Sequence, residues 1–533
     1  MAKKKLDEPD FGRSVRFRPG RTLGRDYARL KIWFGGLILQ AAKKQRRLRP
    51  NTPRQIYDAV DCVLANFLEA HRRSTKCFVA IPLSEAAYTK NNYFKRDFGY
   101  TNFKCVIDFL KKHNPPLVNY KDGFIDYDSK NGRVSRFILS QHLLDLLNGY
   151  VHLFVLPKPG AKLTTTDLMD EALAYSKSHP FKRIAISQSA TRYREASDCI
   201  RLKDSEKRRQ PFRDTVEIRQ MRKELETWND FLEKNHHIDL LLPDGEIEDL
   251  YEKEDNDEEL EAFWSDERDR PKFVELESVR LHRVFNNGSF DEGGRFYGGW
   301  WQNIPSEYRQ FVTINGHTTS EYDYSYLHPA MLYAELGLPL AEDAYEIEGI
   351  DNTKYRKLIK TTFLKLINAQ QGQRIDRPRN EALPKGWTWE NLQKAIIEKH
   401  EPIKKHLRSG VGLKLQRRDA DIAKTVMMRM MKRNTLVLPV HDSFITYHEL
   451  RDDLEKEMRR AYKEQMGTEI GIKANESLRD RYVRELDGFQ LDPEEVVENI
   501  MDRPGYEGYR ERSKEFFRTR TDRWRQRFER REE

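Results

Sequence analysis

The sequence predicts an α+β protein of several domains. Its 533 residues suggest about three or four domains, at a typical size of about 150 residues each. Although 34% of the residues are charged, 27 Phe, 24 Tyr and 8 Trp supply enough apolar surface for packed cores, which excludes a wholly disordered chain. Stretches with the periodicity of amphipathic helices are interrupted by short β-prone runs that end in turn residues, as expected of an α+β fold.

Charge and cysteine content limit the partners and the cellular compartment that we expect for the protein. Lys and Arg number 95 against 86 Asp and Glu, a net charge of +9 that fits a nucleic-acid partner only where the positive charge is clustered. The four cysteines form neither a disulfide framework nor a CxxC zinc site, which suits a reducing cytosol. The longest apolar run, residues 32–42, is too short to span a bilayer and lies too far from the terminus for a signal peptide. We expect a soluble cytoplasmic protein with no membrane partner.

The N-terminal part is expected to be a separate DNA-binding module. Residues 1–50 begin and end with Lys/Arg runs and are expected to form a basic arm, either solvated or in contact with phosphates. Residues 51–160 combine amphipathic helices with a hairpin-like stretch, which is the outline of a winged helix-turn-helix. The loop before the expected recognition helix interleaves basic and aromatic residues, as phosphate contact and groove insertion require. A small structural helical domain is the alternative.

Two further segments carry charge but no assigned chemistry. Residues 161–280 are expected to form a helical linker or thumb-like region, whose acidic stretch is a solvated face or linker. The tail, residues 486–533, is a charged helical segment in which Arg residues are interspersed with aromatic residues. Such a basic amphipathic helix packs on the body of the protein or lies along a nucleic-acid backbone, and packing is the simpler expectation.

Two aspartates stand where strands are expected to end. A β-prone run from Thr318 leads to Asp323, and a helix-like segment follows it. A second apolar run, a polar turn at His441-Asp442 and another alternating run predict a β-hairpin with these two residues at its tip. Carboxylates on adjacent strand ends can hold two Mg²⁺ ions about 4 Å apart, the geometry used for in-line phosphoryl displacement. Either aspartate alone is more often a turn residue.

A basic helix is predicted between these two aspartates. Arg356 and Lys360 are four residues apart, so both project from one face, and Lys357 and Lys365 add positive charge. Cations in this arrangement can grip a triphosphate and neutralise charge on the leaving group. A basic helix alone is more often a solvated face, but the order aspartate, basic helix, aspartate is that of a nucleotidyl-transfer site.

Residues 283–474 resemble the family A, DNA polymerase I-like, nucleic acid polymerases. The resemblance rests on five ordered segments: Gly293-Gly294-Arg295 with Trp301-Gln302-Asn303-Ile304-Pro305 and Arg309, similar to the family's TGR…LQNIP…R; Asp323-Tyr324-Ser325, similar to motif A; Arg356-x3-Lys360, similar to motif B; Gln416 with Ala420-Asp421-Ile422-Ala423-Lys424, similar to QGTAADIIK; and His441-Asp442, similar to motif C. Each segment is short, and the strength of the resemblance lies in their order.

The resemblance implies a right-hand polymerase core with palm, fingers and thumb, preceded by the winged-helix-like domain. It assigns residues 281–345 and 431–485 to the palm and residues 346–430 to the fingers. The implied catalytic residues are Asp323, Asp442 and Lys360; the two aspartates, with the backbone of Tyr324, are implied to bind two Mg²⁺ ions, for which Mn²⁺ can substitute. The residues implied to bind the nucleotide are Arg356, His328, Leu364, Asn368, Tyr324 and Ser325. Those implied to bind primer and template are Arg295, Gln302, Arg309, Gln416 and His441.

The sequence departs from the family pattern in ways that concern nucleotide selection. Motif C usually reads His-Asp-Glu in the DNA polymerases, whereas Ser443 follows the aspartate here, as in single-subunit phage-type RNA polymerases. Asn368 and Ala369 replace the usual Tyr-Gly of motif B, and shorter intervals between the motifs imply trimmed fingers. His328, five residues after Asp323, occupies the place that lies under the sugar in the family, and its imidazole is large enough to crowd a 2′-OH.

These observations predict a template-directed nucleotidyltransferase. We expect a monomeric DNA-directed DNA polymerase that acts on a DNA primer–template, favours dNTPs and serves a replication or mobile-element system of bacterial or phage origin. No set of paired carboxylates typical of a proofreading exonuclease precedes residue 280. Two alternatives remain open: an RNA polymerase or primase with the same core, and a non-catalytic DNA-binding replication or defence protein with a degenerate palm.

Overall fold

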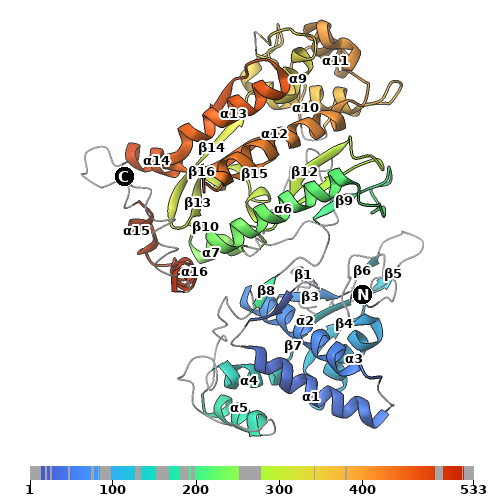
Figure 1. Cartoon of the computed structure of the whole chain (residues 1–533), viewed down its shortest axis with the longest axis vertical. Helices are drawn as coiled ribbons and strands as arrows, with labels where there is room; N and C mark the ends of the chain where they lie inside the picture. The colour runs from blue at the N-terminus through green and yellow to red at the C-terminus, as the bar shows by residue number, and fades with distance from the viewer. Residues whose placement is uncertain are drawn as a thin grey trace, which may run out of the picture. The chain divides into compact units, whose positions relative to one another are not determined.

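The computed structural model of the chain contains two compact units. One comprises Met1–Asp198 with Pro271–Glu277, and the other comprises Cys199–Arg270 with Ser278–Glu533 (Figure 1). The residues that the structure describes are 14–17, 21–24, 27–45, 49–73, 77–81, 83, 98–125, 132–133, 135–151, 167–179, 191–193, 199–250, 276, 278–340, 343–378, 381–485, 496–518 and 520. None of the helices formed by these residues combines the length and apolar character that crossing a membrane requires.

The smaller unit contains helices and short strands. Its helices are α1 (Ala28–Gln45), α2 (Thr52–Arg73), α3 (Gly99–Lys112), α4 (Gln141–Tyr150) and α5 (Asp167–Ser178). Its strands are β1 (Ser14–Arg16), β2 (Arg21–Leu23), β3 (Phe78–Ile81), β4 (Val118–Lys121), β5 (Phe124–Ile125), β6 (Gly132–Arg133), β7 (Ser135–Leu139) and β8 (Thr191–Tyr193).

The segment 1–50 differs from the expected basic arm because it contributes α1 to the folded unit. Helix α1 packs against α2 and buries Leu30, Phe34 and Ile38 in the core of this unit. These apolar residues recur at helical spacing, so the basic residues at the two ends of the segment flank a core helix. The expected amphipathic helix from Thr52 is confirmed by α2.

A sheet with the strand order β1-β3-β7-β4 lies beside these helices. Strands β3 and β7 are antiparallel, as are β7 and β4, with Val118 opposite Leu139. The expected hairpin is therefore confirmed, and β5 pairs with β6 as a short antiparallel extension of it. The basic and aromatic loop that was expected to precede the recognition helix falls largely on residues 84–97, which lie outside the described residues; Lys104 is exposed on α3.

The larger unit carries the predicted motifs. Its helices are α6 (Val216–Asn235), α7 (Asp244–Asp249), α9 (Leu327–Ala334), α10 (Asn352–Asn368), α11 (Trp389–Lys399), α12 (Gly412–Lys432), α13 (Arg451–Met466), α14 (Leu478–Glu485), α15 (Val496–Met501) and α16 (Glu507–Arg518). Its strands are β9 (Ile200–Leu202), β10 (Ile238–Leu240), β11 (His282–Phe285), β12 (Gly293–Tyr297), β13 (Val312–Ile314), β14 (His317–Tyr324), β15 (Leu438–Val440), β16 (Ser443–Tyr447) and β17 (Ile472–Ala474). The 3₁₀ turns η6 (Trp300–Gln302), η7 (Ser306–Phe311), η8 (Glu401–His406) and η9 (His448–Leu450) connect them.

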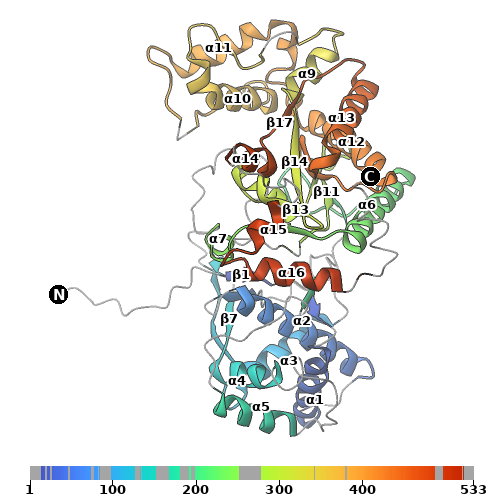
Figure 2. The ribbon, with the colours of Figure 1, turned by 90° about the vertical axis from the view of Figure 1, so that its left-hand side faces the viewer.

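The central sheet has the order β10-β13-β14-β16-β15, and β17 pairs with the end of β14. Helices α12 and α13 contact each other and lie side by side over this sheet, while α9, α10 and α11 gather at one end of the unit (Figures 1 and 2). Strand β10 and α6 come from the segment 161–280, for which a linker or thumb-like region was expected. Part of that segment is instead built into the core: β10 pairs with β13, and α6 buries Met221, Leu225 and Trp228.

The C-terminal tail packs on the larger unit as far as it is described. Arg512 on α16 is buried and donates to both carboxylate oxygens of Asp239 on β10, at 2.9 and 2.7 Å. The Tyr509 and Thr313 hydroxyls are 3.0 Å apart. These contacts fix α16 to the edge of the sheet, which agrees with the packing expected for the tail; residues 521–533 lie outside the described residues.

Candidate active site

The two predicted aspartates are brought together at the centre of the larger unit. Asp323 is the penultimate residue of β14, and Asp442 lies in the two-residue turn between β15 and β16. The register of β14 and β16 places Asp323 opposite Ser443, and the Tyr324 N–H lies 3.4 Å from the Asp442 carbonyl oxygen. Both expected elements, the strand that ends near Asp323 and the hairpin with His441-Asp442 at its tip, are confirmed.

Two non-glycine residues with left-handed backbones flank the pair. His441 has φ 58° in the hairpin turn, and Tyr326 has φ 54° just before α9. Few non-glycine residues adopt this conformation, and such residues cluster at functional sites. The turn at Tyr326 follows the end of β14, and the turn at His441 follows the end of β15. Asp323 and Asp442 therefore both lie where the chain leaves the sheet.

The pKa values of the two carboxyls are shifted in opposite directions. Burial and the neighbouring Asp442 carboxylate raise the pKa of Asp323 to about 8, while Lys360 acts in the opposite direction. Burial also favours the neutral form of Asp442, but the charges of Arg295 and Lys360 outweigh it and hold the pKa of Asp442 below its usual value. Asp323 is therefore the harder of the two carboxyls to ionise as long as no cation is bound.

Asp323 also has an unsatisfied oxygen. Its Oδ1 is buried without a hydrogen-bond partner among the residues that the structure describes. An orphaned carboxylate oxygen in a pair with excess negative charge fits a hard divalent cation, which takes oxygen ligands and retains several waters. No group of three or more His, Cys, Asp or Glu ligands occurs in the described part of the chain. A cation here would therefore depend on the two carboxylates, backbone oxygen, water and substrate.

The predicted basic helix is α10, and its two key cations differ in their surroundings. Asp351 caps the helix by accepting from the Thr353 and Lys354 N–H groups, both at 3.1 Å. Lys360 is exposed, and its charge acts on both carboxyls of the pair. Arg356 instead donates to Asp343 at 2.7 and 3.1 Å and to the Tyr326 hydroxyl at 2.8 Å.

The remaining residues expected to bind the nucleotide have structural contacts. Leu364 is buried on α10, and the Asn368 amide donates to the Leu364 carbonyl oxygen at 2.8 Å. The Tyr324 hydroxyl donates to the Met458 carbonyl oxygen at 2.7 Å, so this side chain points into the core against α13. Ser325 donates its N–H to the Gly471 carbonyl oxygen. Within the described residues, these contacts hold the elements around the pair in place.

Arg295 and His328 converge on Asp419, a residue that sequence reasoning did not select. The Arg295 guanidinium donates to Asp419 Oδ1 at 3.1 Å and to Oδ2 at 2.9 Å, and His328 Nε2 lies 3.0 Å from Oδ2. All three side chains are buried. His328 therefore faces α12, on which Asp419 lies.

The other residues expected at the primer and template also line this region. Gln302 donates to the carbonyl oxygens of Phe296 and Pro439 at 3.0 and 2.9 Å, and Gln416 is buried on α12. The His441 ring lies against Tyr297, with ring centroids 5.4 Å apart. Burial and the charge of Arg295 lower the pKa of His441 to about 4, so this imidazole is neutral at physiological pH.

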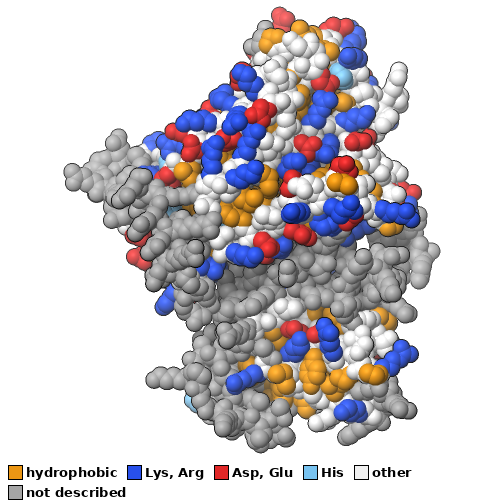
Figure 3. All heavy atoms as spheres, viewed as in Figure 1, with side chains coloured by type: hydrophobic (Ala, Val, Ile, Leu, Met, Phe, Trp, Pro, Cys, Tyr) orange, Lys and Arg blue, Asp and Glu red, His pale blue; other side chains and the backbone are white. Residues whose placement is uncertain are grey.

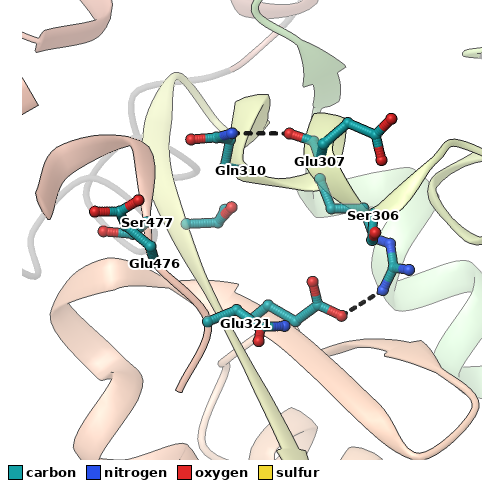
Figure 4. A pocket seen from close by; sticks show the side chains of 9 residues that line it. Ser306, Glu307, Gln310, Glu321, Glu476 and Ser477 are labelled. Atoms are coloured by element: carbon teal, nitrogen blue, oxygen red, sulfur yellow. Dashed lines mark hydrogen bonds and ion pairs between the residues drawn. The ribbon is translucent and has the colours of Figure 1, made fainter. Parts of the chain in front are cut away.

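Arg309 faces a polar cavity beside the carboxylate pair. Its Nη1 lies 2.5 Å from Glu321 Oε1, and the same oxygen accepts from Ser443 Oγ at 2.5 Å. The cavity has a volume of about 270 Å³ (Figure 4) and is lined by Ser306, Glu307, Arg309, Gln310, Thr319, Glu321, Asn475, Glu476 and Ser477.

Three acidic residues near the site were missed by sequence reasoning. Asp343, Asp419 and Glu321 each neutralise a predicted cation, namely Arg356, Arg295 and Arg309. The sequence positions of two of them could have drawn attention to them. Glu321 lies on the same face of its strand as Asp323, and Asp419 lies within the segment that contains Gln416. Asp343 stands alone in a connecting segment, where no spacing relates it to Arg356.

The surface charge does not by itself mark a nucleic-acid path. On the face drawn in Figure 3, the described Lys and Arg side chains of the larger unit are interspersed with Asp and Glu. Many of these charges form ion pairs along helices, such as Arg460 with Glu464 on α13. On this face, the described charges of the larger unit are therefore mixed rather than gathered in one basic patch.

Comparison with known proteins gives a distant structural likeness. No protein-family model and no curated protein matches the chain. Among solved structures, the chain is similar to the POL domain of Pol1 from M. smegmatis in complex with DNA primer-template and dNTP, with a TM-score of 0.24 and 14% sequence identity. The match covers 38% of this chain and 48% of that one, so it spans about half of the polymerase chain's length. A likeness this distant leaves the chemistry to be argued from the site.

Proposed function

We propose that the protein is a template-directed nucleotidyltransferase, and specifically a DNA-directed DNA polymerase that extends a primer with dNTPs. The observation that carries the proposal is the adjacency of Asp323 and Asp442, with Lys360 placed to act on both carboxyls. A carboxylate pair with excess negative charge and an orphaned oxygen favours divalent cations, and a cation-rich helix beside it favours a triphosphate.

The chain's own residues divide the chemistry among them. Asp323 and Asp442, with the backbone of Tyr324, would hold two Mg²⁺ ions, which when bound make a primer hydroxyl more acidic and neutralise triphosphate charge. Lys360 binds phosphate oxygens and donates a proton to the departing pyrophosphate. Arg356 is held by Asp343 and exchanges this carboxylate for phosphate oxygens when the nucleotide binds.

The residues expected at primer and template form the platform on which the strands lie. Arg295 and Arg309 are paired with Asp419 and Glu321, so they hold the surface next to the carboxylate pair in shape. Gln302 fixes the turn before β13 to the β15 strand through the Pro439 carbonyl oxygen. With the pKa of His441 lowered to about 4, its neutral ring gives the primer end an uncharged neighbour beside Asp442.

We further propose that the smaller unit binds duplex DNA as a winged-helix-like domain. The order α2, β3, α3, β4, β7, with β3 and β4 on either side of β7, supports a winged-helix-like arrangement in which α3 is the recognition helix and the β4–β7 hairpin forms the wing. A fragment of residues 1–198, which keeps α1 and β1 in the core of this unit, should bind duplex DNA with an affinity that falls steeply with salt, as measured by fluorescence anisotropy. A folded fragment that does not bind DNA at low salt would leave this unit with a structural role.

An RNA polymerase or primase is the second candidate, because Ser443 follows Asp442 as in the phage-type RNA polymerases. Primer extension with dNTPs and with NTPs, each with and without a primer, separates the two: the DNA polymerase incorporates dNTPs only from a primer. Asp323→Ala attributes the activity to this site, and Asp453→Ala, an exposed aspartate on α13, is the control. A parent protein that incorporates neither substrate but binds DNA would favour the non-catalytic alternative.

A further inference from the structure

Glu321 lies two residues before Asp323 on β14 and accepts a hydrogen bond from Ser443, the residue that follows Asp442. We propose that Glu321 is a positioning residue for the carboxylate pair: through the Ser443 hydroxyl it holds the backbone next to Asp442, and it places a negative charge beside the pair from β14, whereas the family A DNA polymerases that this sequence resembles usually have a glutamate directly after the motif C aspartate. This inference rests on the proposed function, because it assigns Glu321 to the same cation site.

The strand register gives Glu321 access to that position. Asp323 and Glu321 are two residues apart on β14, so both side chains point to the same face of the sheet. Ser443 lies directly opposite Asp323, which makes it the diagonal neighbour of Glu321. Diagonal neighbours on adjacent strands are within reach of long side chains. A glutamate at position 321 can therefore contact residue 443, and a residue as small as serine leaves room for it.

The contacts of Glu321 show that its carboxylate is tied to the site. Oε1 accepts from the Ser443 hydroxyl and lies 2.5 Å from Arg309 Nη1, while the Asn475 N–H donates to the Glu321 carbonyl oxygen at 2.9 Å. Glu321 is buried, and a buried carboxylate is costly unless it is paired and hydrogen-bonded. The hydroxyl of Ser443 is one of the groups that meet this cost, which gives Ser443 a role that alanine could not fill.

The charge of Glu321 also reaches the pair. Because Glu321 and Asp323 lie on the same face of β14, the negative charge of Glu321 adds to the potential at that carboxyl. Arg309, which also lines the polar cavity, balances part of this charge. Because the Ser443 hydroxyl is fixed by Glu321, the backbone next to Asp442 is held at the start of β16. Loss of the Glu321 charge should therefore weaken cation binding by changing both the potential and the position of Asp442.

This arrangement changes the meaning of Ser443. Taken alone, a serine after the motif C aspartate favours an RNA polymerase. Its hydrogen bond to Glu321 gives this serine a structural reason that is independent of the sugar of the nucleotide.

Binding of Mn²⁺ to the full chain without nucleic acid tests the inference, with free Mn²⁺ followed by electron paramagnetic resonance. Glu321→Gln should weaken binding about tenfold, which corresponds to about 1.4 kcal/mol. Ser443→Ala, which leaves the ion pair with Arg309 intact, should weaken it by about threefold, or about 0.7 kcal/mol. Glu307→Gln is the matched control, because it removes the same charge from the same cavity without touching Ser443, and it should match the parent protein.

A relocation variant makes the test independent of any loss of folding. Glu321→Ser weakens binding, and the addition of Ser443→Glu should restore it to within about threefold of the parent. If Glu321→Gln binds Mn²⁺ as the parent does, or if the relocated glutamate restores nothing in a folded protein, the inference is wrong. If the Asp323→Ala protein retains full Mn²⁺ affinity, the proposed cation site itself is wrong, which is a different result.

Discussion

Two groups of charged side chains in the larger unit differ in whether their buried charges have partners within the protein. Around Asp419, Arg295 donates to both carboxylate oxygens and His328 contacts one of them, so the buried charges are paired within the protein. At Asp323, one oxygen is buried without a partner among the described residues, and the carboxyl has a pKa of about 8. In the first group, side chains of the protein pair all the charges named here. In the second group, one carboxyl oxygen lacks a partner, which a positively charged ligand would supply.

The difference separates residues that hold the fold from residues that bind. A paired buried network makes the local structure unique, and removal of one member leaves the others without partners. An unsatisfied carboxylate costs stability and persists where function requires it. We therefore expect substitutions in the first group to affect unfolding and those in the second to affect chemistry.

Asp442→Ala should give the largest effect. Because this carboxylate keeps its charge beside Asp323, its loss should lower the rate of nucleotide incorporation by about 1,000-fold or more, with DNA affinity changed less than about tenfold. Primer extension gives the rate, and gel shift gives the affinity. Asp453→Ala should change neither, and an Asp442→Ala protein that retains incorporation would move the catalytic site elsewhere.

Asp419→Ala should instead destabilise the protein by about 3 kcal/mol, because Arg295 would be left buried without its counter-charge. Urea unfolding measures the change. Asp419→Asn should cost less, since the amide oxygen still accepts from Arg295. Equal stability of the Ala variant and the parent would mean that Arg295 finds another partner and that the network is not structural.

His328→Ala tests whether the two groups meet at the nucleotide sugar. If the imidazole crowds a 2′-OH, removing it should shift the ratio of dNTP to NTP insertion toward NTPs by up to about a hundredfold, or about 3 kcal/mol. Single-nucleotide insertion measures the ratio, with His317→Ala at the opposite end of β14 as the control. A parent that already prefers NTPs, or a ratio that does not move, would leave His328 only as a partner of Asp419.

Much of the site's framework was predictable because it depends on local patterns. Alternating apolar runs around a polar turn predicted the β15–β16 hairpin, and helical spacing predicted α10 with Arg356 and Lys360 on one face. The order of short motifs then brought Asp323 and Asp442 together, although neither aspartate is distinctive alone. The same local signals predicted α2 and the β4–β7 hairpin of the smaller unit.

What the sequence could not provide was the pairing of charges across long separations. Asp419 meets Arg295 from 124 residues away, and Glu321 meets Ser443 from 122 residues away. No periodicity connects such residues, because their contact depends on how β12, α12 and the central sheet pack. The assignment of β10 to this sheet was missed for the same reason: a three-residue strand has too few positions to show a pattern.

The last prediction concerns how the stability of the protein depends on pH through Asp323. Its pKa of about 8 in the folded protein exceeds the value of about 3.9 expected in the unfolded chain. A carboxyl with a raised pKa favours the folded state at low pH, and this contribution is lost as the pH rises toward the folded pKa. Asp323→Asn cannot ionise, so its advantage over the parent should grow from about pH 4 to about pH 8 and then stay constant. Thermal unfolding across this range measures it, with Asp453→Asn as the control.

Millimolar Mg²⁺ should stabilise the parent at pH 8 but not the Asn variant, because only the parent has the carboxylate that a cation needs. Parallel curves for parent and Asp323→Asn would mean that the pair is already balanced by the protein, and the contrast with Asp419 would disappear.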